Sequence, residues 1–140
     1  MSYAAAVALQ TAVWQQLRTD ATLAHLVGDA VYDAMPVDAP GGVYVALGPE
    51  DVRDAGDMTA RGAQHDFVVS VSSGVDDGAE GFARIKAAAV AVTDALDQGA
   101  LELGRGHLVG LWFLRARARR VEKGGARQVD LTFRARIDLN

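Results

Sequence analysis

The strongest constraint on the fold is a period of two residues in the C-terminal part of the sequence. In the last stretch, the apolar positions are Val129, Leu131, Phe133, Ala135, Ile137 and Leu139, and they alternate with Asp130, Thr132, Arg134, Arg136 and Asp138. In the stretch before it, one side is Leu111, Phe113, Arg115, Arg117 and Arg119, and the other is Trp112, Leu114, Ala116 and Ala118. Successive side chains of a strand point to opposite faces, so both stretches are predicted to be strands. The glycine-containing "VEKGGARQ" between them predicts a C-terminal β-hairpin.

This hairpin carries arginines that can share one face, which are Arg115, Arg117, Arg119, Arg134 and Arg136. A disordered basic arm would not keep this alternation through two consecutive strands, so the arginines are expected on a sheet. Side by side they repel one another unless anions or carboxylates lie opposite. The alternative is a solvated sheet face whose charge Asp130 and Asp138 balance locally.

Two short helices and one long helix are expected before the hairpin. After Ser2, a natural N-cap, the apolar residues Ala6, Leu9, Val13 and Leu17 recur at helical spacing. Asp20 as N-cap and Gly28 as stop predict a second helix over residues 21–27. Asp77 and Glu80 resemble a capping box, and Gly99 ends the long helix that follows them. The apolar face of that helix is Phe82, Ile85, Ala89, Val92 and Leu96.

Three further strands are expected, at Val31 and Tyr32, at residues 43–48 and at residues 64–73. The segment "PEDVRDAGDMTARGA" between the last two is rich in acidic side chains and poor in large apolar ones. It is predicted to be a long loop that is either mobile or functional. The whole pattern predicts one α+β domain over residues 1–140, with helices packed on one face of a largely antiparallel sheet.

Charge divides this chain into two regions. The net charge is −4; residues 1–100 are strongly acidic and residues 101–140 are basic. Separate acidic and basic regions can attract a second copy of the chain, whereas a uniformly basic chain would indicate nucleic acid binding. No stretch reaches the roughly 18 to 20 apolar residues of a membrane span. The N-terminus lacks the charge pattern of a signal peptide, so we expect a soluble, unprocessed chain.

No enzyme signature is present in the sequence. The absence of cysteine excludes disulfides, thiolate catalysis and cysteine-ligated metals. His25, His65 and His107 are not at metal-ligand spacings, and neither a phosphate-binding loop nor a nucleophile elbow occurs. We therefore expect no enzyme activity, no cofactor and no metal. A small enzyme or ligand-binding domain stays open as the alternative, which a deep pocket with convergent polar groups and a perturbed pKa would favour.

Several segments, taken in this order of elements, resemble the tail-completion family of long-tailed bacteriophages. These proteins are also called tail terminator or head-to-tail joining proteins, and the family has relatives in prophages and gene transfer agents. The segments are "LVGDAVYDAMPVDAP", "YVALG", "TARGAQHDFVVSV" and "GHLVGLWFLRARARRVEKGGARQVDLTFRARI". Thr59, Arg61, Gly62 and His65 resemble the T-x-R-G-x-x-H stretch of the family. The chain departs from the family in "GGVYV", where an aromatic residue followed by Pro-Tyr is common, and in "SVSSG", which lacks a tryptophan.

The resemblance implies a structural virion protein that caps the head-proximal end of the tail tube as a ring, usually of six subunits. Such a ring is assembled in the host cytoplasm, stops tube growth, and contacts the tail tube protein and the head-tail connector or adaptor protein. It binds no membrane, and DNA only passes through its lumen. Another neck or tail-tube subunit of related fold is the alternative.

A ring needs one patch of each subunit to meet a different patch of the next, and the charge division offers such a pair. We therefore hypothesise that Asp51, Asp54 and Asp57 lie at subunit or tube interfaces opposite the hairpin arginines. The full candidate set is Asp51, Asp54, Asp57, Thr59, Arg61, His65, Arg115, Arg117, Arg119, Arg134 and Arg136. A lumen that conducts DNA should not bind phosphates tightly, so we expect the basic face to lie mainly against protein.

Overall fold

The computed structural model describes residues 3–38, 41–58, 61–73, 78–98, 101–120 and 127–139. The helices are α1 (Ala6–Thr19), α2 (Ala21–Val27) and α3 (Gly78–Gln98). The strands are β1 (Val31–Tyr32), β2 (Val43–Asp54), β3 (Gly62–Ser73), β4 (His107–Arg120) and β5 (Arg127–Asp138). The predicted α+β class and the C-terminal hairpin of β4 and β5 are confirmed.

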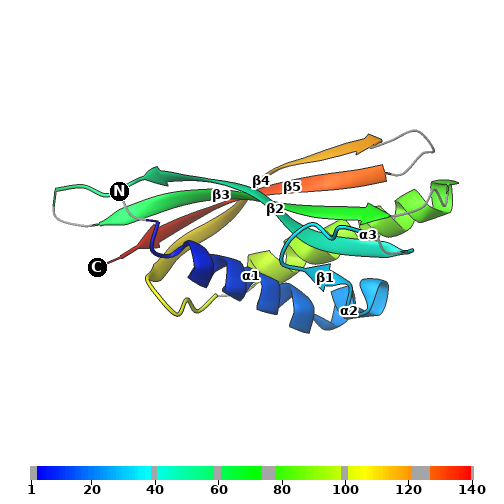
Figure 1. Cartoon of the computed structure of the whole chain (residues 1–140), viewed down its shortest axis with the longest axis horizontal. Coiled ribbons are helices and arrows are strands. Elements are labelled where there is room, and N and C mark those ends of the chain that lie inside the picture. The colour runs from blue at the N-terminus through cyan, green and yellow to red at the C-terminus, as the bar shows by residue number, and fades with distance from the viewer. Residues whose placement is uncertain are drawn as a thin grey trace.

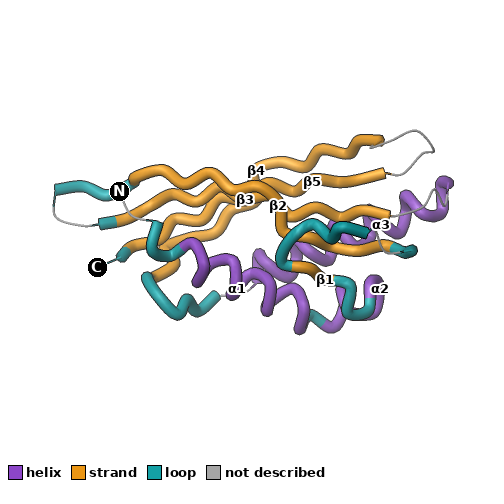
Figure 2. Tube along the Cα trace, in the orientation of Figure 1, coloured by secondary structure: helices purple, strands orange, loops and turns teal. Residues whose placement is uncertain are grey.

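The five strands form one sheet in the order β1-β2-β3-β5-β4. Only the short β1 runs parallel to its neighbour, and every other neighbouring pair is antiparallel. The helices pack on one face of this sheet, which leaves the other face open (Figures 1 and 2). The end of β2 and the start of β3 lie at one end of the long axis, and the end of β4 and the start of β5 lie at the other (Figure 1). We call the two sides of the sheet the helix face and the open face.

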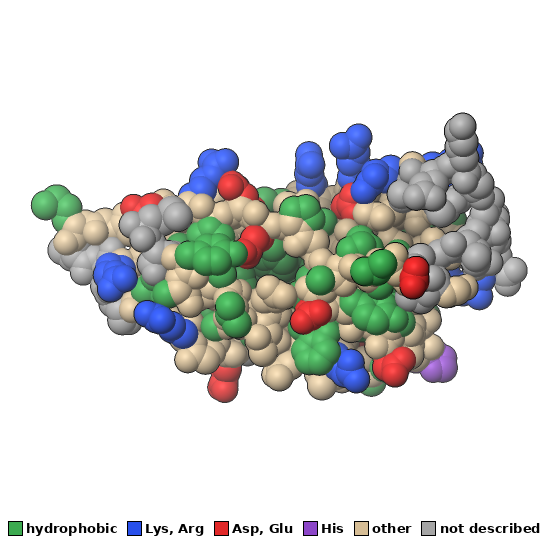
Figure 3. Space-filling model, viewed as in Figure 1, with side chains coloured by type: hydrophobic (Ala, Val, Ile, Leu, Met, Phe, Trp, Pro, Cys, Tyr) green, Lys and Arg blue, Asp and Glu red, His purple; other side chains and the backbone are tan. Residues whose placement is uncertain are grey.

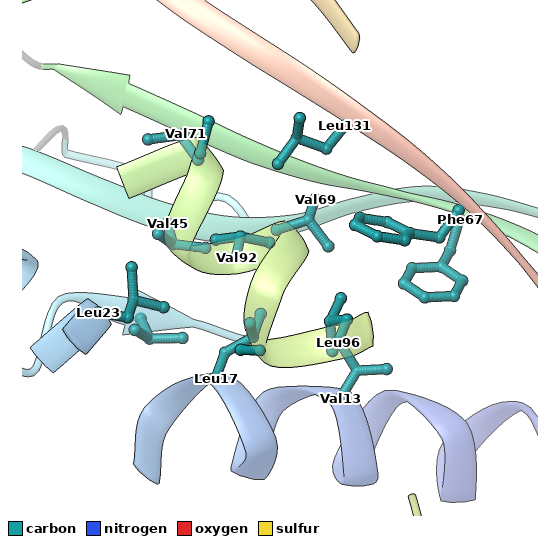
Figure 4. Close-up of a cluster of buried hydrophobic side chains, with 14 of the residues drawn as sticks. Val13, Leu17, Leu23, Val45, Phe67, Val69, Val71, Val92, Leu96 and Leu131 are labelled. Atoms are coloured by element: carbon teal, nitrogen blue, oxygen red, sulfur yellow. The ribbon is translucent and has the colours of Figure 1, made fainter. Parts of the chain in front are cut away.

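The core lies between the sheet and the helices. Figure 4 shows Val13 and Leu17 of α1 and Val92 and Leu96 of α3 pointing toward strand residues such as Val69. The predicted inward residues that lie in β5 are all buried, and they are Val129, Leu131, Phe133, Ala135 and Ile137. Leu139, which was predicted with them, follows the strand and is half-buried. Burial of large apolar side chains contributes roughly 1.5 to 3 kcal/mol each, so this alternation sets which face of the hairpin meets the helices.

The helix ends follow local chemistry at α2. The Asp20 carboxylate accepts a hydrogen bond from the Leu23 N–H at 2.9 Å, and Gly28 ends the helix with a φ of 65°. Both predicted boundaries are confirmed. The prediction for Ser2 is wrong, because α1 begins at Ala6 and Ala5 occupies the N-cap position without a side-chain hydrogen bond. Asp77, Gly99 and the side chain of Glu80 lie outside the part of the chain that the structure describes.

The predicted long loop is largely a hairpin. β2 continues through the acidic segment to Asp54, and β3 begins at Gly62, so residues 50–54, 62 and 63 are paired strand. A register shift between Leu47 and Glu50 interrupts β2 at Gly48 and Pro49. Proline cannot donate to a ladder, and this bulge accommodates it. The outer half of β2 is mostly exposed and has no apolar alternation, so its strand character comes from backbone pairing with β3.

The predicted alternation in β4 is also wrong, because the strand contains two bulges. Register shifts lie between Leu108 and Gly110 and between Phe113 and Arg115. Phe113 pairs with Phe133 on the helix face, whereas Arg115 pairs with Thr132 on the open face. The extra residue, Leu114, thus shifts the alternation by one position. On the helix face β4 places Leu111, Phe113, Ala116 and Ala118, and on the open face it places Trp112, Arg115, Arg117 and Arg119.

Candidate functional site

The open face carries the five hairpin arginines. The pairing of β5 with β3 and with β4 shows which side chains share this face. They include Arg115, Arg117, Arg119, Arg134 and Arg136. Figure 3 shows Lys and Arg side chains projecting along the upper margin of the molecule, where Figure 1 places β4 and β5. The prediction that these arginines share one face is confirmed.

Three of these arginines have carboxylate neighbours within the chain. Arg134 binds Asp66 with two hydrogen bonds, from Nε to Oδ1 at 2.8 Å and from Nη2 to Oδ2 at 3.0 Å. This hydrogen bonding is the main reason why the pKa of the Asp66 carboxyl lies below its ordinary value, and partial burial opposes it. Arg119 Nε lies 3.1 Å from Asp130 Oδ2, and Arg136 Nε lies 3.9 Å from Asp138 Oδ1. Local balancing, which the sequence left open, therefore holds for these three arginines.

Asp130 is held in a polar network on the open face. Its Oδ1 accepts hydrogen bonds from the Ser70 hydroxyl at 2.7 Å and from Gln128 Nε2 at 2.6 Å. The Ser72 hydroxyl donates to Gln128 Oε1 at 3.1 Å. Burial of Asp130 raises its pKa, but the hydrogen bonds from Gln128, Ser70 and Arg119 outweigh that cost, so the net shift is downward. The carboxylate is thus fixed as an ionised acceptor rather than poised for proton transfer.

Arg115 and Arg117 differ from the other three. Neither forms a hydrogen bond or ion pair with any residue in the described ranges, and both side chains are exposed. They line a broad, open hollow of about 520 Å³ together with Met35, Pro49 and Thr132. Two unneutralised guanidinium groups beside an open hollow form a surface that favours an anionic partner.

The acidic candidates lie in the β2–β3 hairpin. Asp51 is on the open face, opposite Asp66, and its Oδ2 lies 3.1 Å from Arg53 Nε. Asp54 ends β2 on the helix-face side, Asp57 is exposed in the turn, and Arg61 is exposed just before β3. Thr59 lies outside the described residues. Within one chain the structure does not bring these acidic groups onto Arg115 and Arg117.

His65 lies on the helix face and not on the surface. Its side chain is fully buried, opposite Val52 and Ala135, and neither ring nitrogen has a hydrogen-bond partner in the described part of the chain. Burial lowers the pKa of this imidazole, and the charge of Glu50 opposes the shift. Glu50 itself accepts a hydrogen bond from the Tyr3 hydroxyl. His65 can therefore influence an interface only through the residues that cover it.

Replacing His65 should make the protein more stable and less sensitive to acid. A buried polar group without partners costs about 1 kcal/mol or more, so His65→Leu is expected to raise the free energy of unfolding by about 1 kcal/mol at pH 7. Because the pKa is below its ordinary 6.5 in the fold, the unfolded chain binds a proton as the pH falls through 6.5 and the folded chain does not. Stability is lost in that window, and His65→Leu should remove this loss. Urea unfolding from pH 7.5 to 5 measures both effects.

The exposed His25 supplies the control, since His25→Gln also removes an imidazole but should keep the wild-type pH profile. A His65→Leu protein that is less stable than wild type at pH 7 would show that the imidazole has a favourable partner.

A cavity of about 130 Å³ lies between α1 and the β2 bulge and is lined by residues that include Leu9, Val13, Glu50 and Phe67. Among the residues that the structure describes, no group of three or more His, Cys, Asp or Glu side chains could hold a metal ion. In the same ranges, no helix is long and apolar enough to cross a membrane.

Sequence reasoning missed the exposed apolar residues of β4. Val109, Trp112, Phe113 and Leu114 are between 43% and 53% exposed. Trp112 was expected to share a side with Ala116, but its ring lies over Gly110 on the open face, where a Cβ on the glycine would meet ring atoms at 2.5 Å. The glycine is the one signal in the sequence, because a residue without a side chain permits this close approach.

Comparison with known proteins finds a matching family and matching solved structures. The sequence pattern of the family described as tail completion protein gp17 matches residues 11–138. A chain in the solved structure of the virion of a native gene transfer agent particle is 63% identical, with a TM-score of 0.87. The alignment covers 98% of this chain and 99% of that chain. No match was found among the curated proteins.

Proposed function

Because this chain belongs to the tail completion protein gp17 family, we propose that it caps the head-proximal end of a phage-like tail tube and joins the tail to the head connector. It is a structural tail protein, and its activity is to bind other subunits. The resemblance over nearly the whole length to a chain of a gene transfer agent virion supports this assignment. The protein acts in the particle, after assembly in the cytoplasm of the bacterial host.

The protein caps the tube as a ring, in which each subunit contacts the next through two different surfaces. The observation that carries this proposal is the pair of unneutralised arginines, Arg115 and Arg117, on the open face of a chain whose acidic β2–β3 hairpin does not contact them within the subunit. Patches that cannot meet within one chain can meet between neighbours, and such heterologous contacts generate rings. A ring of six subunits has the tail tube protein on one side and the connector on the other.

DNA crosses the lumen of this ring without being held there. Tight binding of phosphates by arginine would slow its passage, since each neutralised phosphate adds salt-dependent affinity. The arginines of the open face are therefore assigned to protein contacts. Charge pairing with Asp66, Asp130 and Asp138 already neutralises part of that face.

The test is deletion of the gene from the strain that encodes it, followed by negative-stain electron microscopy of the particles. Overlong or unattached tails, restored by supplying the protein, are expected. Normal joined particles of normal length would contradict the proposal. Tubes built from the purified protein alone would identify it as a tube subunit instead.

A further inference from the structure

Both edges of the sheet contain a short, regular segment without a neighbouring strand. β4 is the last strand of the sheet, and beyond its second bulge it pairs regularly with β5 from Arg115 to Arg120. At the other edge, β1 covers only Val45 and Ala46 of β2, so Glu50–Asp54 has no strand on its outer side among the described residues. Strand edges of this kind present unpaired N–H and C=O groups that can bind another strand.

The two free edge segments are complementary in charge and similar in length. The β2 segment carries Glu50, Asp51 and Asp54 against one arginine, and the β4 segment carries Arg115, Arg117, Arg119 and Arg120. Like segments would repel one another, because β4 beside β4 would oppose arginine to arginine. This pattern disfavours pairing of β4 with β4, and the opposite net charges of the two segments favour pairing of β2 with β4 of another copy.

We propose that Glu50–Asp54 of one subunit pairs as an antiparallel strand with Arg115–Arg120 of the next, so that the sheet continues from subunit to subunit. This inference rests on the ring in the proposed function and names its contact. β2 and β4 run in opposite directions within one sheet, so a neighbour placed with its helices on the same side gives antiparallel pairing without turning over. Asp51, with its ion-paired Arg53, then joins the arginines on the open face, and Val52 joins Ala116 and Ala118 on the helix face, where Glu50 and Asp54 also lie.

This pairing requires a stagger along the strands. Val52 pairs with His65, which in turn pairs with Ala135 of β5. Ala116 and Ala118 pair with Leu131 and Val129, which precede Ala135 in β5 by four and six residues. At about 3.4 Å per residue the stagger is roughly 14 to 20 Å, and four strand spacings of about 4.8 Å give a width of roughly 19 Å. The strands then tilt by roughly 35 to 45°, which is the range that closed sheets use. The offset between the two free segments is therefore compatible with a closed sheet.

Cysteine cross-linking tests this contact, because the chain has no cysteine of its own. Opposite residues of paired strands have Cα atoms about 4.5 to 5.5 Å apart, within the range that a disulfide bridges. We would prepare Val52→Cys with Ala116→Cys, and Val52→Cys with Ala118→Cys, in one chain. Oxidised particles should give a ladder of covalent multimers on a denaturing gel for at least one pair. The largest multimer in the ladder gives the number of subunits in the ring.

On the same gel, each single variant should stay monomeric. The pair Val52→Cys with Gln15→Cys should also stay monomeric; Gln15 is an exposed residue of α1. Tail length is measured on the same particles, which separates the two proposals. Tails of normal length without cross-links from either pair would overturn the edge contact and leave the tail-capping role intact. Cross-linking of residue 116 or 118 to a different polypeptide would also overturn it. Cross-links in the purified protein, with normal tails in the deletion strain, would sustain the contact and remove the role.

Discussion

Reversal of the charges of Arg115 and Arg117, as Arg115→Glu with Arg117→Glu, is expected to abolish tail capping while the domain stays folded. Both side chains are exposed and have no partner within the described residues, so their loss should change the free energy of unfolding by only about 0.5 kcal/mol. At the proposed contact, however, glutamates would face the acidic segment of the neighbouring β2, and like charges placed opposite one another cost several kcal/mol at an interface. Tail lengths in a complemented deletion strain should match those of the uncomplemented strain.

The matched control changes the net charge equally at a different site. Arg18 on α1 and Arg105 in the loop before β4 are exposed, so Arg18→Glu with Arg105→Glu should complement the deletion. Circular dichroism and thermal unfolding establish that both proteins are folded. Normal tails with the Arg115 and Arg117 variant would show that these arginines do not bind a subunit.

The second large effect concerns stability. Phe133 is 2% exposed and lies between Phe67 and Phe113, with ring centroids 5.5 and 5.7 Å away. Phe133→Ala removes a large side chain from the centre of the core and is expected to cost about 3 to 5 kcal/mol. Since the total stability of such a domain is about 5 to 15 kcal/mol, the variant should be close to unfolding. Urea denaturation followed by circular dichroism measures the change.

Phe113 provides the comparison on the neighbouring strand. It faces the same side of the sheet but is 49% exposed, so Phe113→Ala should cost about 1 kcal/mol. Equal losses for the two variants would show that the edge of β4 is as tightly packed as the centre of the sheet.

Sequence reasoning succeeded where one face of an element is buried. In β5, every second residue from Val129 to Ile137 packs under the helices, so the apolar period and the structure agree. The same holds for Leu9, Val13 and Leu17 of α1. Burial of one face makes any other register costly, and this cost is what a hydrophobic pattern records.

It failed where no face is buried. The outer half of β2 reads as an acidic loop because its side chains are mostly exposed, although its backbone pairs with β3 from Glu50 to Asp54. Backbone hydrogen bonds leave no mark on side-chain composition. The bulge at Leu114 was missed for a related reason. The residues of β4 beyond Phe113 are exposed on both faces, so no buried apolar side chain among them fixes the face on which the alternation of arginine and alanine continues.

The candidate site was predicted in part. Within each strand the arginines are two residues apart, which predicted that they share one face of the sheet. The structure confirms that the arginines of β4 and β5 lie together on the open face. Which arginines are already neutralised depends on Asp66 and Asp130, whose positions follow from the pairing of β3 with β5 and of β5 with β4, not from their place in the sequence.

The bulge at Leu114 also bears on how relatives of this chain should be compared. In a strand, the face that a residue occupies depends on whether its distance from a reference point is odd or even, and an extra residue reverses that parity for everything beyond it. A homologue of the same length without this bulge would align almost perfectly and yet direct its arginines toward the helix face, whereas one that lacks Leu114 would keep them on the open face. Counting positions from β5, where the parity is set by the core, avoids this error.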